Sequence, residues 1–382
     1  MKIATFNIQN IFHRHIDLIN DNYEQKITEW TRELDSLFKK GEKTETDFLR
    51  MRELTGHIDF NGLRSFKTNI SRQLELESYK NREDTHLYFQ YSKFVNEESK
   101  WHTVPIPFGA LYNKLKVVGK CDADILILQE VESRYALLKM NEMLYQNSLE
   151  SSYKDIIHLD GNNKCGLGMG IMVKNGFRIK TIKSHSSERD VDGSLLFQND
   201  LQVYKVETPK GEMIHILCVH IDSSLQDKAN ASKRARQASM VSKVYNELRS
   251  VGNETIVILG TLNAPIFSKC LAPITDMDVT DIADYTNFDV EPDFGTDSGY
   301  YRLGGFRKGV NMEQLDYLLA SPQIGERIQN CGMDRKAIWP IRQPQWDIYK
   351  TLKKEQDAAS EHPLLWVNIE MNPDALELKN SA

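Results

Sequence analysis

One short stretch, Asp124–Glu132, constrains the fold of this chain most, because it places acidic side chains at the end of a buried strand. Its first part, Ile125–Leu128, is an uninterrupted aliphatic run, too short for an ordinary helix, and predicts a strand covered on both faces. Gln129, Glu130 and Glu132 follow directly. Carboxylates there are costly unless a cation or hydrogen bonds receive them. The alternative is a strand that simply emerges into water.

Length and charge set broad limits on the function. The chain has 382 residues, which fits two domains or one enlarged domain, and its hydrophobic content of 40% is ample for a core. A net charge of −6 argues against tight, sequence-independent binding of nucleic acid, which relies on clustered lysine and arginine. A local basic cleft remains compatible with this composition.

Cysteine usage and the N-terminal residues favour an intracellular protein. The five cysteines are odd in number and form no CxxC pair. Residues 1–7 contain no basic segment followed by an apolar one, as a secretory signal would. No apolar run approaches the length of a membrane span. We therefore expect a reduced, cytoplasmic protein without a membrane span, and no pattern indicates a protein partner.

A helical insertion is expected after the first strand, which we predict at residues 1–8. Apolar residues recur at spacings of three and four over residues 16–38, at Phe48, Met51 and Leu54, and over residues 63–74. These stripes predict a mainly helical insertion at 11–104, with residues 1–10 and 105–382 forming the main domain.

The rest of the chain is richer in strands than in helices. Helices are expected at 109–120 and 228–250. Strands are expected near 167–174, 177–183, 200–206, 213–221, 255–260, 315–320 and 364–371. Clustered strands with few helices predict strands packed mainly against strands, with helices outside.

Strand after strand is bounded by a residue that can bind a metal or a phosphate. A single asparagine or aspartate at such a position is usually a turn former, and a lone histidine is more often a satisfied core group. Six such positions together indicate one shared site. They are Phe6-Asn7, Gln129-Glu130, His220-Ile-Asp-Ser223, Gly260-Thr-Leu-Asn263, Leu315-Asp-Tyr317 and Ser360-Glu-His-Pro363.

This ordered set resembles the endonuclease/exonuclease/phosphatase superfamily, typified by pancreatic deoxyribonuclease and exonuclease III. The resemblance covers residues 1–8 and about 109–371 and also takes in Gly168–Lys174 and Arg236-Gln-Ala238. It implies an α/β fold, a four-layer α/β/β/α sandwich of the deoxyribonuclease type, with the site at one rim of two sheets. It also implies a catalytic domain that hydrolyses phosphoesters with Mg²⁺ or Mn²⁺.

The resemblance assigns roles position by position. Glu130 would be the principal metal ligand, helped by Asn7 and Glu361. Asp316 would orient His362, which contacts the scissile phosphate. His220 would be the second phosphate-facing group, and Asn263 would hold the phosphate or the nucleophile.

Two positions depart from the family pattern. Thr261 stands where the family has an aspartate that activates or orients water, and Glu361 replaces another aspartate. Asp222 is an unexpected gain that shares a face with His220 on an extended backbone. Three hypotheses follow: a non-catalytic relative that binds phosphate or metal, an active hydrolase in which Asp222 replaces the lost carboxylate, or an engineered Thr261. We favour the hydrolase because the other six site residues are kept together.

The substrate is less constrained than the chemistry. A nuclease or nucleotide phosphodiesterase is the default, with nucleic acid or a nucleotide as substrate, because this is the commonest family activity. A phosphatase or phospholipase acting on a small phosphoester is the alternative. Gly304–Lys308 can form a phosphate-gripping loop, although a glycine-rich surface turn is the more common explanation of such a sequence. We further expect the insertion to form one wall of the substrate cleft.

Overall fold

The computed structural model describes residues 1–15, 33–34, 36–59, 103–146, 152–163, 165–222, 228–291, 314–340 and 346–371. The chain divides into two compact units: Met1–Ile11 with Phe108–Ala382, and Phe12–Pro107. The first unit contains two mixed sheets and most of the helices in the part of the chain that the structure describes. The division lies within a few residues of the predicted insertion at 11–104.

One sheet of the first unit has seven strands and contains both the first and the last strand of the described residues. Its order is β12 (Phe288–Asp289), β14 (Ile328–Asp334), β15 (Leu364–Ile369), β1 (Lys2–Asn7), β4 (Ile125–Val131), β6 (Gly168–Val173) and β5 (Asp155–Asp160). β1 runs parallel to β4 and antiparallel to β15. The aliphatic run predicted as a doubly covered strand is the centre of β4, where all four residues are fully buried.

The second sheet has six strands. Its order is β11 (Thr280–Asp281), β13 (Asp316–Ala320), β10 (Ile256–Thr261), β9 (Met213–His220), β8 (Leu201–Glu207) and β7 (Arg178–Ser184). β9 and β10 are parallel, whereas β13 is antiparallel to β10. The carboxyl ends of β9 and β10 therefore meet the beginning of β13 at one edge.

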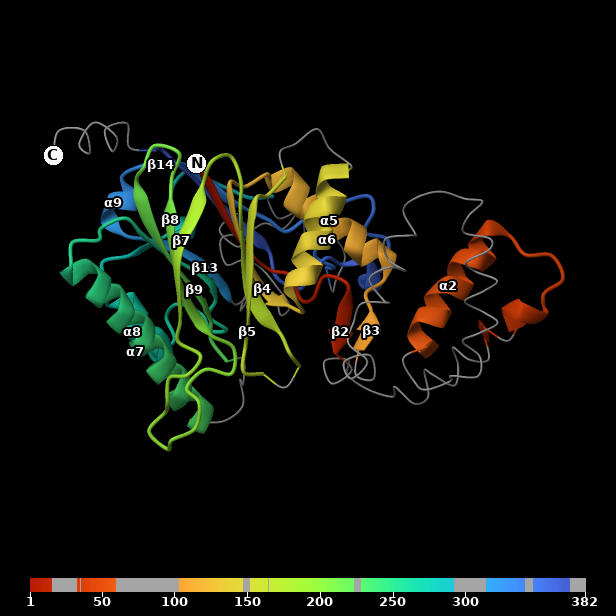
Figure 1. Cartoon of the computed structure of the whole chain (residues 1–382), viewed down its shortest axis with the longest axis horizontal. Coiled ribbons are helices and arrows are strands. Elements are labelled where there is room, and N and C mark those ends of the chain that lie inside the picture. The colour runs from red at the N-terminus through yellow and green to blue at the C-terminus, as the bar shows by residue number, and fades with distance from the viewer. Residues whose placement is uncertain are drawn as a thin grey trace. The chain divides into compact units, whose positions relative to one another are not determined.

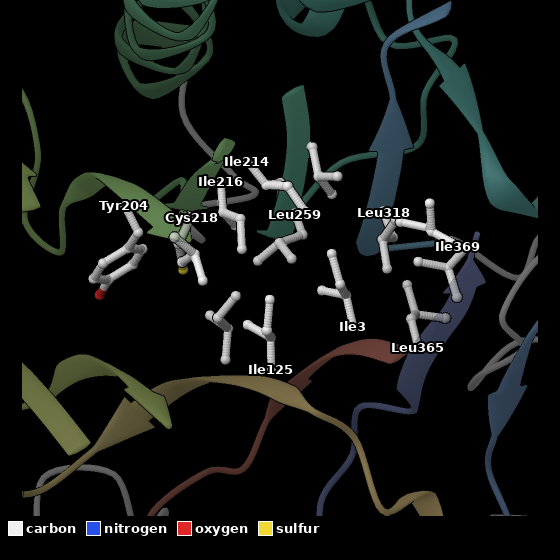
Figure 2. Packing of buried hydrophobic residues seen from close by; sticks show 14 of the residues in the cluster. Ile3, Ile125, Tyr204, Ile214, Ile216, Cys218, Leu259, Leu318, Leu365 and Ile369 are labelled. Carbon is white, nitrogen blue, oxygen red and sulfur yellow. The ribbon is translucent and has the colours of Figure 1, made fainter. Parts of the chain in front are cut away.

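The two sheets pack face to face through a single apolar layer. Figure 2 shows Ile3, Ile125 and Leu365 of the first sheet facing Leu259 and Leu318 of the second. These side chains are at most 4% exposed. Burial of such residues contributes about 1.5–3 kcal/mol each, so the inter-sheet layer is a main source of stability.

Helices cover the outer faces of both sheets. α5 (Phe108–Cys121) and α6 (Arg134–Gln146) lie on one side, and α7 (Lys228–Ser250) and α8 (Ala272–Thr275) lie on the other (Figure 1). A Cβ at Gly170 would lie 2.5 Å from Leu137 Cδ1, so β6 has glycine where α6 packs closely. A short helix, α9 (Pro322–Gly325), follows β13. This arrangement confirms the predicted four-layer α/β/β/α sandwich, and α6, β5 and β14 are elements that the sequence did not predict.

The second unit is described only in part. β2 (His13–His15) pairs with β3 (Thr103–Pro105) in an antiparallel ladder. α2 (Glu45–Asp59) contains the predicted stripe, and its Met51 and Leu54 are buried together with Leu34. Most of the other two predicted stripes lies outside the described residues. The mainly helical character of the insertion therefore stays a prediction.

Candidate functional site

The first-sheet part of the site is formed where β1 and β4 end side by side. Asn7 pairs with Gln129, and the next residue, Glu130, has a left-handed backbone with φ of 57°. The ladder to β6 shifts register between Gln129 and Val131, which makes Glu130 an extra, bulged residue. Bulges redirect side chains at sheet edges and are frequent near active sites. Here the bulge leaves the Glu130 side chain 21% exposed in an otherwise buried strand.

The second-sheet part consists of three residues in adjacent strands. Thr261 pairs with His220 in the parallel ladder and with Asp316 in the antiparallel ladder. Gly260 has φ of 124°, and a Cβ there would lie 2.1 Å from the carbonyl oxygen of Val219. Only glycine fits that position, which directly precedes Thr261 at the end of β10.

A continuous chain of hydrogen bonds joins the two sheets. The Asn7 side-chain amide donates to Glu130 Oε1 at 3.0 Å and to Thr261 Oγ1 at 3.2 Å. The Thr261 hydroxyl donates to Asp316 Oδ1 at 2.7 Å. The other Asp316 oxygen, Oδ2, lies 2.7 Å from His362 Nδ1. Five of the predicted site residues thus form one connected network.

The Asp316 contact sets the tautomer of His362. A carboxylate oxygen accepts hydrogen bonds, so Nδ1 of His362 carries a proton and points to Asp316. This hydrogen bond from Nδ1 to the carboxylate also fixes the orientation of the imidazole ring. Nε2 is then the ring nitrogen that does not face Asp316.

His220 and Glu130 form the other acid–base pair. His220 Nε2 lies 3.7 Å from Glu130 Oε1, and His220 is 5% exposed. Burial lowers the pKa of His220, and the neighbouring Glu130 carboxylate partly offsets this effect. A buried, neutral imidazole beside a carboxylate is suited to hydrogen bonding at a phosphate.

Asn263 and Asp222 occupy the loops beside the network. Asn263 has φ of 53°, and its side-chain amide donates to the Ile221 carbonyl oxygen at 2.7 Å. Asp222 Oδ1 accepts from the Gln198 backbone N–H at 3.3 Å, and its Oδ2 lies 3.7 Å from Lys233 Nζ. Neither side chain joins the hydrogen-bond chain that links the two sheets.

The last predicted ligand, Glu361, is exposed, and its backbone N–H donates to Gln9 Oε1 at 2.9 Å. Ser360 donates through its hydroxyl to the Asn7 carbonyl oxygen at 2.7 Å. These contacts bring the segment before β15 against the segment after β1. Ser223 and Gly304–Lys308 lie outside the described residues.

The donor set fits a hydrated metal ion rather than a closed metal cage. Glu130, Asn7 and Glu361 offer the hard oxygen atoms that Mg²⁺ prefers, and Mg²⁺ commonly uses one or two carboxylates and keeps several waters. Among the described residues, no group of three or more His, Cys, Asp or Glu side chains is placed to hold a metal. Glu130, at the partly open rim, is the residue that could hold such an ion.

Two supporting residues were missed in the sequence. Gln9 receives the Glu361 N–H at 2.9 Å, and Lys114 on α5 donates to backbone carbonyls on both sides of the site. A signal for Lys114 existed, because it interrupts the apolar stripe of Leu111, Val117 and Val118. Gln9 had no distinguishing signal.

No protein-family model and no curated protein matches the chain. Truncated TDP2 from Caenorhabditis elegans is a similar solved structure, with 16% identity, a TM-score of 0.44, and coverage of 69% of this chain and 90% of that one. The endonuclease/exonuclease/phosphatase from Bacteroides vulgatus has 14% identity and a TM-score of 0.45, with coverage of 68% and 91%. The mannosyl-6-phosphatase Bt3783 of Bacteroides thetaiotaomicron has 14% identity and a TM-score of 0.45, with coverage of 69% and 90%.

Within the described residues, no helix is both long and apolar enough to cross a membrane.

Proposed function

We propose that this chain is a phosphoester hydrolase assisted by a divalent cation, with its site at the rim shared by the two sheets. The observation that carries the proposal is the pairing of Asp316 with His362 at 2.7 Å, linked through Thr261 and Asn7 to Glu130. Nuclease or nucleotide phosphodiesterase activity remains our default for the substrate class.

The residues present can position and stabilise a reacting phosphate. His362, oriented by Asp316, offers Nε2 to a phosphoryl oxygen, and His220 offers a second ring from the adjacent sheet position. When bound at Glu130, Mg²⁺ or Mn²⁺ would stabilise negative charge on the phosphoryl group. Groups fixed in place before the reaction are effective because they need not reorganise.

Thr261 limits the help that the chain can give to the attacking water. Its hydroxyl proton goes to Asp316 and its oxygen accepts from Asn7, so it has no role as a base. General-base assistance is typically worth about 10²–10⁴ in rate. This observation favours a second candidate function, a non-catalytic relative that binds a phosphate-containing ligand.

Metal binding and turnover together test the proposal. Titration calorimetry with Mg²⁺ and Mn²⁺ should detect one site that Glu130→Ala weakens strongly. Hydrolysis of bis-p-nitrophenyl phosphate should require the metal and should be lost in His362→Ala. Glu247→Ala is the control, because this carboxylate is 57% exposed on the outer helix α7.

The outcomes separate the two candidate functions. Metal binding without hydrolysis would favour the phosphate-binding relative. The absence of both heat and hydrolysis at millimolar metal would contradict the hydrolase.

A further inference from the structure

Two chain segments of the first unit hold the site residues but lie beyond the strand ladder that pairs them. β1 and β15 pair from Lys2–Asn368 to Phe6–Leu364. The last pair joins Phe6 to Leu364. Asn7 comes directly after Phe6, and His362 lies two residues before Leu364, outside β15. Contacts outside the β1–β15 ladder therefore hold Asn7 relative to His362, among them those of the Ser360 hydroxyl, which donates to the Asn7 carbonyl oxygen and accepts from the His362 N–H.

Lys114 makes further contacts of this kind, because it reaches both the segment after Asn7 and the segment before His362. It is 1% exposed on α5, at a position of the helix that otherwise carries apolar side chains. A buried ammonium is costly unless its donors are satisfied. Here Nζ donates to the carbonyl oxygens of Ile8 and Ala359 and lies 3.5 Å from that of Gln9.

These three carbonyls belong to the two segments that leave the ladder. After Asn7 the backbone turns through left-handed residues, with φ of 49° at Gln9 and 66° at Asn10. Ala359 directly precedes Ser360, whose hydroxyl donates to the Asn7 carbonyl oxygen at 2.7 Å. An ammonium group has three donors and can satisfy carbonyls from both segments at once.

We propose that Lys114 is a positioning residue that clamps the segment after Asn7 to the segment before His362. The carbonyl oxygens that it reaches belong to Ile8, Gln9 and Ala359, none of which is a predicted metal ligand. Only the effect of Lys114 on turnover depends on the proposed function. The clamp itself is a statement about the fold of the site and can be measured without substrate or metal.

Asn113 provides a matched control on the same helix. It is fully buried, and its side-chain amide donates to the Asp357 carbonyl oxygen at 2.7 Å. Asn113 therefore ties α5 to the chain before β15, as Lys114 does. Its hydrogen bonds go to Asp357 and Thr351, whereas those of Lys114 also go to residues 8 and 9. Loss of stability without loss of the clamp is the result expected for Asn113→Ala.

Hydrogen exchange followed by mass spectrometry, with the metal-free full chain, tests the clamp directly. Lys114→Met should speed exchange in peptides covering residues 5–12 and 357–364, whereas Asn113→Ala should leave residues 5–12 as in the wild type. Lys114→Gln keeps two N–H donors in place of three and should give intermediate exchange, which preserves the test if Lys114→Met does not fold. Equal exchange of residues 5–12 in wild type and both Lys114 variants, or equal acceleration by Asn113→Ala, would overturn the proposal.

Turnover adds a second readout. A displacement of about 1 Å can cost about 10²-fold in rate, so Lys114→Met should lower kcat by about that factor with KM little changed. Asn113→Ala should keep kcat near the wild-type value below its unfolding temperature. If the wild type itself hydrolyses nothing, the proposed function fails, and the exchange measurement alone decides the role of Lys114.

Discussion

Thr261 donates its hydroxyl proton to Asp316 Oδ1 at 2.7 Å while it accepts from the Asn7 amide at 3.2 Å. Thr261 is fully buried, so this hydroxyl is the link between the two sheets at the floor of the site. A threonine here accepts the Asn7 hydrogen bond, as a carboxylate also would, and donates one to Asp316, which an ionised carboxylate cannot do.

We predict that Thr261→Asp raises phosphodiesterase activity. A carboxylate can accept the proton of water, and this help is worth about 10²–10⁴ in rate. The same carboxylate would lie beside Asp316, and adjacent carboxylates resist double ionisation. The gain should therefore come with a lower melting temperature. Hydrolysis of bis-p-nitrophenyl phosphate and of single-stranded DNA measures the first effect, and a thermal melt the second.

Thr261→Val is the control for that substitution. It has a similar shape but leaves both Asn7 and Asp316 short of a partner, which costs about 1–3 kcal/mol. A parent protein and a Thr261→Asp variant that are equally inert would exclude a site repairable by one carboxylate.

Asp222→Asn should reduce activity if Asp222 compensates for the missing aspartate. Asp222 is adjacent in sequence to the β9 end, and its carboxylate is one of the charges that act on the pKa of His220. Asn keeps the acceptor for the Gln198 N–H but removes the charge opposite Lys233. A steady-state comparison at pH 7 measures the effect. Asp222→Asn with wild-type kcat and KM would show that this carboxylate serves only the loop.

The left-handed backbone of Glu130 predicts a separation of stability from function. A non-glycine residue with this conformation costs roughly 1–2 kcal/mol, and Glu130 has φ of 57°. Both Glu130→Ala and Glu130→Gly remove the carboxylate, but only glycine removes the strain. Urea denaturation should therefore find the Gly variant more stable than the Ala variant by about 1 kcal/mol, with both equally poor in metal binding. Equal stabilities would mean that the bulge carries no strain.

Much of this fold, but less of its site, could be predicted from the sequence. The aliphatic run Ile125–Leu128 predicted a strand covered on both faces, because that pattern is local in the sequence. The clustering of such runs predicted that strands pack mainly against strands. The bulge at Glu130 could not be predicted, since it depends on the register of β6. The two hydrogen-bond partners of Thr261 are Asn7 and Asp316, which lie 254 and 55 positions away in the sequence. No local pattern predicts such contacts.

Burial of Asp200 predicts a pH-dependent stability that its amide variant lacks. Asp200 is 1% exposed, and burial raises its pKa although Ser184 donates to it at 2.6 Å. The folded state then binds a proton more tightly than the unfolded state. Its contribution to stability is therefore present below the ordinary carboxyl pKa of about 4 and is lost as pH rises through the raised value.

Urea unfolding of Asp200→Asn and wild type at pH 4, 6 and 8 measures this effect. The stability of the variant relative to wild type should improve as pH increases. Glu247→Gln, at a side chain that is 57% exposed, should show a constant difference. A constant difference for Asp200→Asn would contradict the predicted shift.

Removal of residues 12–107 should leave a folded domain with the complete candidate site. The two large buried clusters of the sandwich consist of residues from the first unit, and so do Asn7, Glu130 and His362. The second unit has its own small cluster around Leu34, Met51 and Leu54. Units with separate cores can be separated when the joint is flexible, so Ile11 and Phe108 should be linked by a short Gly/Ser segment.

Cooperative urea unfolding of the deletion variant measures the first expectation, and hydrolysis of a dinucleotide and a long duplex measures the second. If the insertion restricts access, as its position in the sequence after Asn7 suggests, the ratio of duplex to dinucleotide hydrolysis should rise. The same deletion carrying Glu130→Ala is the control and should be folded but inactive. A folded deletion variant with unchanged kinetics on both substrates would show that the insertion does not limit access, and loss of cooperative unfolding would show that the sandwich depends on it.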